Sequence, residues 1–405
     1  MNYVTLAIPF FILLMAVECL YGHFRSNQTY RLNDTINSLQ MGTLSRLVSI
    51  LKLGFSGVVF AWLVSLFGIE TIATDSIWVW LAAFIAYDFC YYWKHRFGHE
   101  WRIMWASHAA HHQSEEYNLS TALRQTGTDY IGFVFYLPLY LAGLPVEVVV
   151  TVGSLNLIYQ FWVHTEHVRT LGPLEWIMIT PSNHRVHHAR NPDYIDRNYG
   201  GVFIIWDRLF GTFQPELAEQ RCVYGITKGL KSWNPIWANF HVWYETFQIS
   251  LRTKNIGDKF RVWFKGPGWY PEDMQPTEQT DWQYAKFDPS IDRFSGWYSF
   301  FNYWVLTGAS LGLLAIQNDL PRYYALLVFA WLCFSFYSQC CWLEARTSAL
   351  RLETIRLISM ALLLVLGANV GLDQMIINVF SAYCVIAALL VGAYSLNLKA
   401  PMAAG

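Results

Sequence analysis

Long runs of apolar residues recur along this chain and limit the folds that it can adopt. A helix needs about 20 mostly apolar residues to cross a bilayer, and a spanning segment must pair its backbone groups internally. We expect spanning helices over Tyr3 to Tyr21, Ile50 to Gly68, Ile77 to Trp93, Trp297 to Ile316, Tyr323 to Trp342, Ile355 to Val370 and Met375 to Tyr394. The apolar stretch from Tyr130 to Val163 has "AGLP" near its middle and predicts a helical hairpin with short arms, either re-entrant or spanning.

Composition and loop charges support a membrane protein and orient it. Charged residues make up 14% of the chain, whereas a soluble domain carries about 25%. The formal net charge of −1 gives no reason to expect a nucleic-acid partner. The loop "GIETIATDS" has no basic residue, and the other side of the expected membrane is basic and therefore cytoplasmic by the positive-inside rule. The basic residues on that side are Arg25, Arg31, Arg46, Lys52, Lys94, Arg96, Arg102, Arg346, Arg351 and Arg356.

Ten of the twelve histidines lie between positions 95 and 188, where the topology places them on the cytoplasmic side. The membrane would be the inner membrane of a bacterium or the endoplasmic reticulum of a eukaryote. Residues at i, i+3 and i+4 share one face of a helix, so each histidine group can form one face and the faces can converge. The groups are His95 and His99; His108, His111 and His112; His164 and His167; and His184, His187 and His188.

Clustering of this kind indicates a metal site rather than isolated core histidines. Protonated imidazoles close to one another repel, and a bound metal ion holds them neutral. One ion cannot use so many imidazoles, so two ions with open positions are expected. The HExxH pattern of zinc proteases is absent from the sequence. An all-histidine site beside a bilayer suits a redox metal, and we expect two irons that use dioxygen to oxidise a lipid C–H bond.

These motifs resemble the membrane fatty acid hydroxylase and sterol desaturase superfamily. Within it, "YYWKHRFGHEWRIMWASHAAHH", "NLSTALRQ", "PSNHRVHHARN" and "NYGGVFIIWD" are similar to the alkylglycerol monooxygenase family, most densely from about Tyr87 to Trp269. The resemblance implies a diiron monooxygenase that hydroxylates the carbon beside the ether oxygen of a glycerol ether lipid. The product then breaks into a fatty aldehyde and a glycerol derivative. The resemblance also implies tetrahydrobiopterin as the reductant.

The family's motif positions fall on nine of the ten clustered histidines. The sequence departs from the family pattern at two positions, Asn183 and His167. Asn183 stands where the animal relatives have histidine. His167 follows "HTE", where those relatives usually lack a histidine, although more distant fatty acid hydroxylases have one nearby. We therefore include His167 among the metal ligands, with Glu166 as the alternative contributor. The predicted ligands are His95, His99, His108, His111, His112, His164, His167, His184, His187 and His188.

Two carboxylates are candidates for catalytic or supporting roles. Glu100 follows the first motif and would orient an imidazole or ligate a metal; the alternative is a plain surface charge. Asp88 lies seven residues before His95 on the same helical face and inside an expected span. It would accept a hydrogen bond from a ligand histidine; the alternative is a salt bridge to an arginine or lysine. The segment "SEEYNLSTALRQ" would meet a lipid headgroup or a pterin, or only pack the cap.

The sequence therefore predicts an all-α fold, a polytopic membrane helical bundle with a cytosolic helical cap that holds a histidine-rich dimetal site. We expect N-terminal transmembrane helices over 1–93, a catalytic region over 94–295 that includes the hairpin 130–163 and the cap, and C-terminal transmembrane helices over 296–405. Partners would be a membrane lipid substrate, dioxygen and an electron donor.

Two other functions stay open at this point. A fatty acyl or sterol hydroxylase or desaturase would have the same fold and metals but a different product. A histidine-rich metal transporter or chaperone belongs to another class. Such proteins usually gather histidines in flexible low-complexity tracts, whereas the histidines of this chain stand at helix-face spacing.

Overall fold

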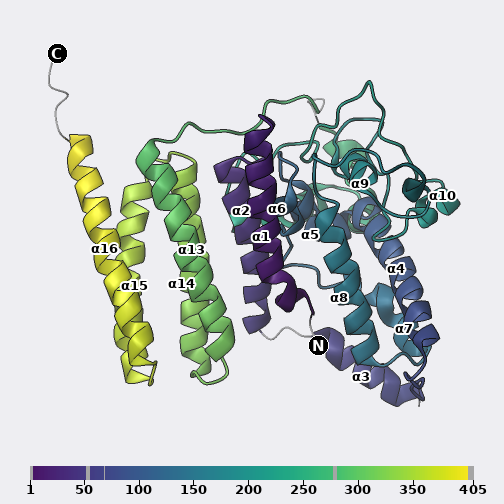
Figure 1. Cartoon of the computed structure of the whole chain (residues 1–405), viewed down its shortest axis with the longest axis horizontal. Helices are drawn as coiled ribbons and strands as arrows, with labels where there is room; N and C mark the ends of the chain where they lie inside the picture. The colour runs from purple at the N-terminus through teal and green to yellow at the C-terminus, as the bar shows by residue number, and fades with distance from the viewer. Residues whose placement is uncertain (1–2, 52–54, 68, 277–280, 400–405) are drawn as a thin grey trace. The chain divides into compact units, whose positions relative to one another are not determined.

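The computed structural model describes residues 3–51, 55–67, 69–276 and 281–399. Within these ranges the chain forms helices and two isolated bridges but no strand, which confirms the predicted all-α class (Figure 1). The α-helices are α1 Tyr3–Phe24, α2 Leu32–Leu47, α3 Phe55–Phe67, α4 Ile77–Glu100, α5 Arg102–His112, α6 Leu119–Ala122, α7 Leu137–Leu141, α8 Val146–Trp162, α9 Pro181–His188, α10 Ile205–Phe210, α11 Pro235–Arg252, α12 Ile256–Phe264, α13 Arg293–Ile316, α14 Arg322–Leu343, α15 Ala349–Asn369 and α16 Gln374–Lys399.

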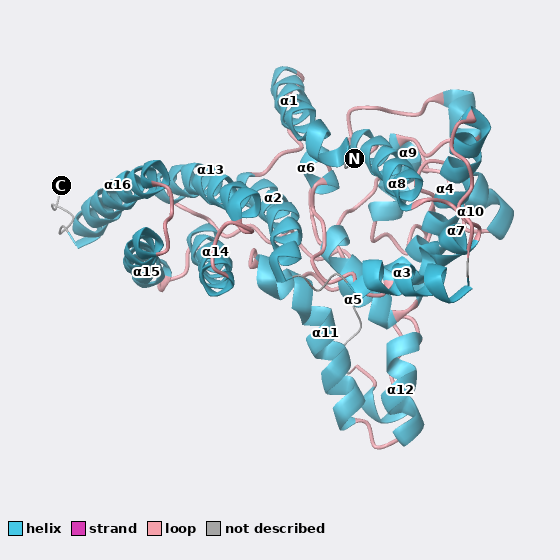
Figure 2. Ribbon diagram, turned by 90° about the horizontal axis from the view of Figure 1, so that it is seen from below, coloured by secondary structure: helices cyan, strands magenta, loops and turns pink. Residues whose placement is uncertain are grey.

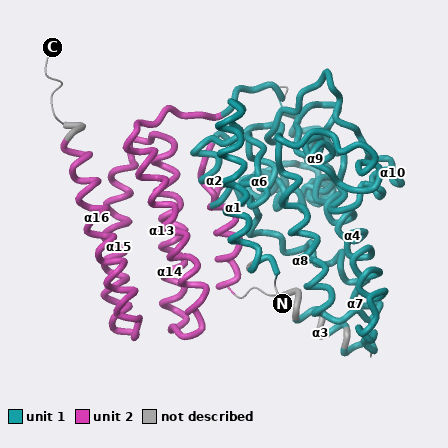
Figure 3. The backbone as a smooth tube through the Cα atoms, in the orientation of Figure 1, with its two compact units in different colours: residues 1–39, 53–231, 238–286 teal, residues 40–52, 232–237, 287–405 magenta. Residues whose placement is uncertain are grey.

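The chain divides into two compact units, which Figure 3 distinguishes by colour. The first comprises residues 1–39, 53–231 and 238–286, and it contains every clustered histidine. The second comprises residues 40–52, 232–237 and 287–405. The predicted domain boundaries at 93/94 and 295/296 describe membrane topology rather than compactness, and they stay predictions.

Four helices within the described ranges are long and apolar enough to cross a membrane, as expected for a membrane protein. They cover Leu6–Phe24, Arg293–Ile316, Arg322–Leu343 and Gln374–Leu396. The expected span at 50–68 overlaps α3, which has 13 residues, and residues 52–54 and 68 lie outside the described ranges. The two arms of the expected hairpin are short apolar helical segments, Gly132–Leu141 and Val146–Trp162. The spans expected at 77–93 and 355–370 fall on α4 and α15 and stay predictions.

Helix α4 positions the first histidines because it continues beyond its apolar part. The Ser76 side chain caps its start by accepting a hydrogen bond from the backbone of Trp78. The helix packs against α5 and α8. It ends where Trp101 is extended, and the N–H of Arg102 then donates to the carbonyl of Lys265 at 2.9 Å. This sharp turn brings the histidines of α5 back against those of α4.

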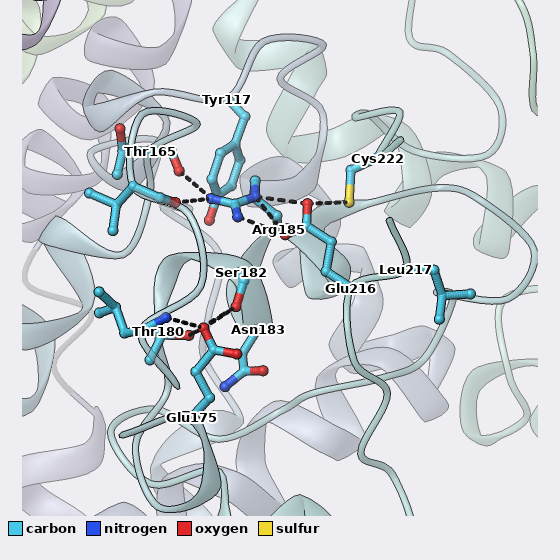
Figure 4. Close-up of polar contacts among 12 residues, drawn as sticks. Tyr117, Thr165, Glu175, Thr180, Ser182, Asn183, Arg185, Glu216, Leu217 and Cys222 are labelled. Atoms are coloured by element: carbon cyan, nitrogen blue, oxygen red, sulfur yellow. Dashed lines mark hydrogen bonds and ion pairs between the residues drawn. The ribbon is translucent and has the colours of Figure 1, made fainter. Parts of the chain in front are cut away.

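Helix α9 carries the last histidine group and is held by charged and polar contacts. It has eight residues, begins at Pro181 and is buried along its whole length. Arg185 pairs with Glu216 at 2.6 Å and also donates to the carbonyls of residues 165 and 168 (Figure 4). Glu175 accepts from Ser182 at 2.7 Å near the first turn. A helix this short is marginal alone, so these contacts fix where it lies.

Helices α11 and α12 lie side by side in Figure 2 and are bound through the Ser250 hydroxyl, which donates to the carbonyl of Lys259 at 2.8 Å. Their large exposed side chains recur every three or four residues, which places them in one row along each helix. We call these two rows together the exposed apolar row; it consists of Phe240, Tyr244, Phe247 and Leu251 on α11 and Ile256, Phe260 and Phe264 on α12.

The second unit is built mainly from α13 to α16, which pack in chain order. Most of its core is apolar and centres on Leu306, Leu332 and Phe336, each of which is fully buried. One ion pair interrupts this core. Glu353 and Arg356 on α15 are both completely buried and bind each other.

Candidate metal centre

The structure brings nine of the ten predicted histidine ligands into two adjacent sets. Within each set the ligand nitrogens lie within 4.8 Å of one another, which is close enough to surround one ion. The five-histidine set contains His95, His99, His108, His112 and His187, and the four-histidine set contains His111, His164, His184 and His188. The sets adjoin, because the His112 and His188 rings stack at a centroid distance of 4.4 Å.

Helical spacing explains how the two HxxHH motifs divide between the sets. In α5, His108 and His112 stand four residues apart and enter the five-histidine set, while His111 turns to the other set. In α9 the arrangement is reversed: His184 and His188 enter the four-histidine set and His187 crosses over. Helical spacing alone predicts that all three histidines of each motif share one face. The structure instead gives each motif a ligand pair at i, i+4 and a third ring for the neighbouring set.

The Nε2 atoms of these rings point toward one another. The Nε2 of His108 lies 3.0 Å from the Nε2 atoms of both His95 and His112. In the other set, the Nε2 of His164 lies 3.1 Å from that of His184 and 3.4 Å from that of His111. Ring nitrogens this close either share a proton in a hydrogen bond or lie around a cation, and imidazole Nε2 atoms that converge in this way fit metal coordination.

Backbone carbonyls bind the opposite nitrogens of four ligand rings. The Nδ1 of His95 lies 2.7 Å from the carbonyl oxygen of Tyr199, and that of His164 lies 2.7 Å from the carbonyl of Gln160. His111 and His187 pair in the same way with the carbonyls of Arg124 and Arg197 at 2.9 Å. Since a carbonyl only accepts, the proton sits on Nδ1 and Nε2 keeps its lone pair for a metal.

Several ring nitrogens in the two sets are buried and have no hydrogen-bond partner among the described residues. They are the Nε2 atoms of His99, His187 and His188 and the Nδ1 of His184. A buried polar atom without a partner costs about 1–3 kcal/mol. Metal coordination would satisfy the three Nε2 atoms, and this is the observation that makes the residues fit a metal site.

Burial keeps the imidazoles in the state that binds metal. Loss of hydration lowers the pKa of His111 to about 4, although its carbonyl contact acts in the opposite direction. Burial likewise holds the pKa of His188 well below its usual value, and the neighbouring imidazoles lower it further. The same direction holds for the pKa values of His108, His112, His164, His184 and His187. These rings are therefore neutral at pH 7 without a metal.

Asp88 does not bind a ligand histidine, contrary to the sequence-based hypothesis, and neither does it form the alternative salt bridge in the described contacts. It is fully buried in α4 and accepts hydrogen bonds from the backbone of Val202 at 2.8 Å and Phe203 at 3.1 Å. It also accepts from the side chains of Asn156 at 2.7 Å and Trp206 at 2.9 Å. Asp88 is thus a positioning residue for the 199–206 segment, which supplies the carbonyl that orients His95.

Asp207 completes this support and was missed in the sequence analysis. Its carboxylate accepts from the backbone of Tyr199 at 2.7 Å and Gly200 at 2.8 Å, and from the Thr212 hydroxyl at 2.7 Å. The quoted "NYGGVFIIWD" contains both the carbonyl and this carboxylate. An acidic residue eight positions after Tyr199 carries no recognisable pattern, so only the fold reveals the contact.

Glu100 and His167 do not join the metal site in this structure. Glu100 pairs with Arg96 at 2.8 Å and leaves 37% of its side chain exposed, as in the surface-charge alternative. His167 belongs to neither histidine set and lies edge-on to Tyr21 at a ring-centroid distance of 5.1 Å. Glu166 contacts the exposed Arg221 at 3.6 Å instead of a histidine.

A small cavity adjoins the five-histidine set. It encloses about 50 Å³ and is lined in part by His95, His108 and Tyr91. Lys94 and Asp129 also line it and pair with each other at 2.6 Å. A cavity needs about 10–15 Å³ by this measure to hold one water molecule, so the cavity has room for a small molecule beside the ring nitrogens.

The "NLSTALRQ" segment packs the cap, which is one of the two roles proposed for it. Arg124 is 1% exposed, donates to the carbonyl of Ala110 at 2.6 Å and donates to the Gln113 side chain at 3.0 Å. The backbone carbonyl of Arg124 also orients His111. Asn118 caps α6. These contacts make the segment part of the scaffold behind the four-histidine set.

Helical membrane segments joined to a buried cage of histidines define the class of membrane hydroxylases with a metal site. A family model described as fatty acid hydroxylase matches residues 80–212, which include both histidine sets. Alkylglycerol monooxygenase of Danio rerio is 38% identical over 372 residues, 89% of this chain and 82% of the relative. The Homo sapiens enzyme is 44% identical over 274 residues, 67% of this chain and 60% of the relative. No solved structure matches.

The chain therefore belongs to the alkylglycerol monooxygenase family, as its motifs indicated. A more distant relative, ornithine lipid hydroxylase of Rhizobium tropici, is 32% identical over 142 residues, 35% of this chain and 43% of the relative. The more distant likeness covers about a third of this chain, whereas the likeness to the Danio rerio enzyme extends over most of it.

Replacing Asp88 by Asn should weaken metal binding by about 10- to 100-fold, the usual cost of losing outer support at a metal site. The amide cannot accept from all four donors, so the Tyr199 carbonyl would no longer hold His95 in place. Chelator competition followed by metal analysis measures the change. Glu100→Gln is the matched control on the same helix and should change affinity by no more than about twofold, because it alters a surface group. Equal effects of the two substitutions would refute the positioning role.

Lowering the pH from 7.5 to 5 should destabilise the metal-free protein. The buried imidazoles have pKa values below the roughly 6.5 of an unfolded chain. The unfolded state therefore binds more protons in this range, and the free energy of unfolding decreases as the pH is lowered. Thermal unfolding in detergent measures the slope. His188→Gln should reduce it, while His23→Gln at an exposed position should not. A slope unaffected by His188→Gln would contradict this linkage.

Proposed function

We propose that this protein is an iron-dependent membrane monooxygenase that cleaves the O-alkyl bond of glycerol ether lipids. The single observation that carries the proposal is the pair of buried histidine sets, five and four rings, whose Nε2 atoms converge. Family membership supports the ether-lipid substrate, because relatives named alkylglycerol monooxygenase match most of the chain.

The proposed ligands of one iron are the five-histidine set, and those of the other iron are the four-histidine set. Two separate sets support two ions, and all-imidazole coordination supports a redox-active metal. When bound, the irons supply dioxygen activation. His167 is the tenth predicted ligand, and its position outside both sets favours a role in packing beside Tyr21. Glu100 and Asp88 are proposed as a surface charge and a positioning residue respectively, and neither touches the reacting atoms.

The proposed reaction inserts one oxygen atom of dioxygen into the C–H bond beside the ether oxygen. The other oxygen atom leaves as water, and an external reductant supplies two electrons with two protons. We propose a reduced pterin, tetrahydrobiopterin, as this reductant from the family likeness. The resulting hemiacetal loses its C–O bond to give a fatty aldehyde and a glycerol hydroxyl. The protein's own part is to exclude water from the buried site and to hold the imidazoles at fixed orientations.

We propose that the histidine sets face the cytoplasm, on the basic side of the membrane. The lipid would enter from the bilayer, and the cavity beside His95 and His108 would admit dioxygen next to the metal. The exposed apolar row on α11 and α12 supports contact with the membrane surface, since an amphipathic helix lies at the interface with its apolar face in lipid.

Purified protein loaded with iron should contain about two irons per chain. His184→Ala combined with His188→Ala removes two ligands of the four-histidine set and should reduce the content to about one iron. His99→Ala combined with His187→Ala should do the same through the five-histidine set. Elemental analysis gives the count for each variant. Loss of all iron from both variants would mean that the rings form one shared site rather than two.

The ether-lipid assignment is tested by comparing a 1-O-alkylglycerol with the monoacylglycerol of the same chain length. Aldehyde should form from the ether alone, with dioxygen consumed and a reduced pterin required. Oxygen-18 gas should label the aldehyde, provided that it is trapped before its carbonyl exchanges with water. A hydroxylated acyl product from the ester would indicate a fatty acyl hydroxylase. Bound, exchangeable metal without any dioxygen uptake would indicate a transporter or chaperone.

A further inference from the structure

The second compact unit contains a buried polar chain that the proposed reaction does not use. Glu353 and Arg356 are completely buried and form an ion pair on α15. Glu353 also accepts from the Tyr298 hydroxyl and from the Ser338 hydroxyl, the latter at 3.0 Å. Burying a charged pair in an apolar core has a large desolvation penalty, and an ionisable group at membrane depth is a functional candidate by default.

The hydrogen bonds that connect this ion pair to its neighbours have a fixed donor-to-acceptor order. Arg356 donates to the Tyr383 hydroxyl at 2.7 Å. An arginine only donates, so the Tyr383 oxygen is the acceptor and its own proton goes onward to the side-chain oxygen of Asn302. The orientation of the Asn302 amide follows from this order. Its oxygen accepts the hydrogen bond from Tyr383, and its NH₂ group is the last member of the hydrogen-bonded series.

The series of hydrogen bonds ends at a donor that has no partner among the described residues. Asn302 is 2% exposed, and its Nδ2 atom has no hydrogen-bond acceptor among the described residues. A buried donor left in this state is unfavourable, because it has lost its hydrogen bonds to water without gaining another. The donors upstream polarise one another along the chain, so the terminal N–H group is a strong donor for an incoming acceptor.

Asn302 lines an apolar groove between α13 and α16. The groove encloses about 390 Å³ and is bordered by Trp297, Phe301 and Val305 on α13 and by Ile386 and Leu390 on α16. The residues from Phe294 to Val305 cover roughly 16 Å of helix at about 1.5 Å per residue. The shape and lining fit a hydrocarbon chain, and the free amide donor fits an oxygen at one point along it.

We propose that this groove binds a long-chain acyl lipid whose carbonyl oxygen accepts a hydrogen bond from Asn302 Nδ2. The carbonyl supplies the missing acceptor, and the hydrocarbon chain covers the apolar side chains of α13 and α16. A free fatty acid and an ester lipid share this chemistry. The site is independent of the histidine sets, since all of its residues belong to the second unit.

The test uses the full-length protein in detergent and a diazirine-bearing hexadecanoic acid as the photoreactive probe. Peptide mass spectrometry should locate cross-links on α13 and α16 between residues 294–305 and 383–390. Hexadecanoic acid or its methyl ester should compete, and their relative strengths distinguish a free acid from an ester as the natural ligand. Hexadecane lacks the carbonyl and should compete about three- to tenfold more weakly, which is the range expected for one neutral hydrogen bond.

Asn302→Asp removes the N–H donor while keeping an oxygen for Tyr383. It should weaken carbonyl competitors about three- to tenfold and leave hexadecane unchanged. Asn378→Asp on the exposed side of α16 is the control and should change neither. Val305→Trp fills the groove without touching the polar chain and should abolish labelling, which keeps the test open if the Asn302 variant does not fold. Equal competition by hexadecane and the carbonyl lipids, or labelling that survives Val305→Trp, would overturn the proposal.

Discussion

Nine imidazoles gathered in one region must each find partners for two ring nitrogens, and the first compact unit is organised around this requirement. Water is excluded from the rings, and neighbouring imidazolium ions would repel each other. Backbone carbonyls bind the Nδ1 atoms of four of these rings, namely His95, His111, His164 and His187. The converging Nε2 atoms leave a place for one cation in each of the two sets.

Because backbone carbonyls orient the imidazole rings, the segments that supply those carbonyls must themselves be held in place. The carbonyl of Tyr199 can orient His95 only if the surrounding backbone is rigid, and two buried carboxylates provide that rigidity. Asp88 binds backbone N–H groups of the segment, and Asp207 binds the N–H of Tyr199 itself. Three of the four carbonyls, those of Arg124, Arg197 and Tyr199, lie outside helices, and that of Gln160 lies near the end of α8.

The sequence predicted the parts of this arrangement that depend on local geometry. Spacing at i, i+4 identified His95 with His99 and His184 with His188, and both pairs share a set. The crossing of His111 and His187 between sets could not be predicted, because it depends on the angle at which α5 meets α9. Asp88 was recognised as unusual because a carboxylate inside an apolar run is conspicuous. Its partners lie more than a hundred residues away along the chain at Val202 and Phe203, and no local pattern connects them.

In the apolar helices of the second unit, the sequence predicted the secondary structure but not the polar contacts. Their apolar runs predicted helices correctly, but hydropathy treats every apolar helix as equivalent and therefore gave the C-terminal helices no chemistry. An ion pair in such a core is a poor stabiliser, since well-packed apolar residues of similar volume often serve as well or better. Glu353 and Arg356 are better explained by what they do to their neighbours. They orient Tyr383, which in turn orients Asn302, and so a charge inside the bundle fixes the direction of a single amide beside the apolar groove between α13 and α16.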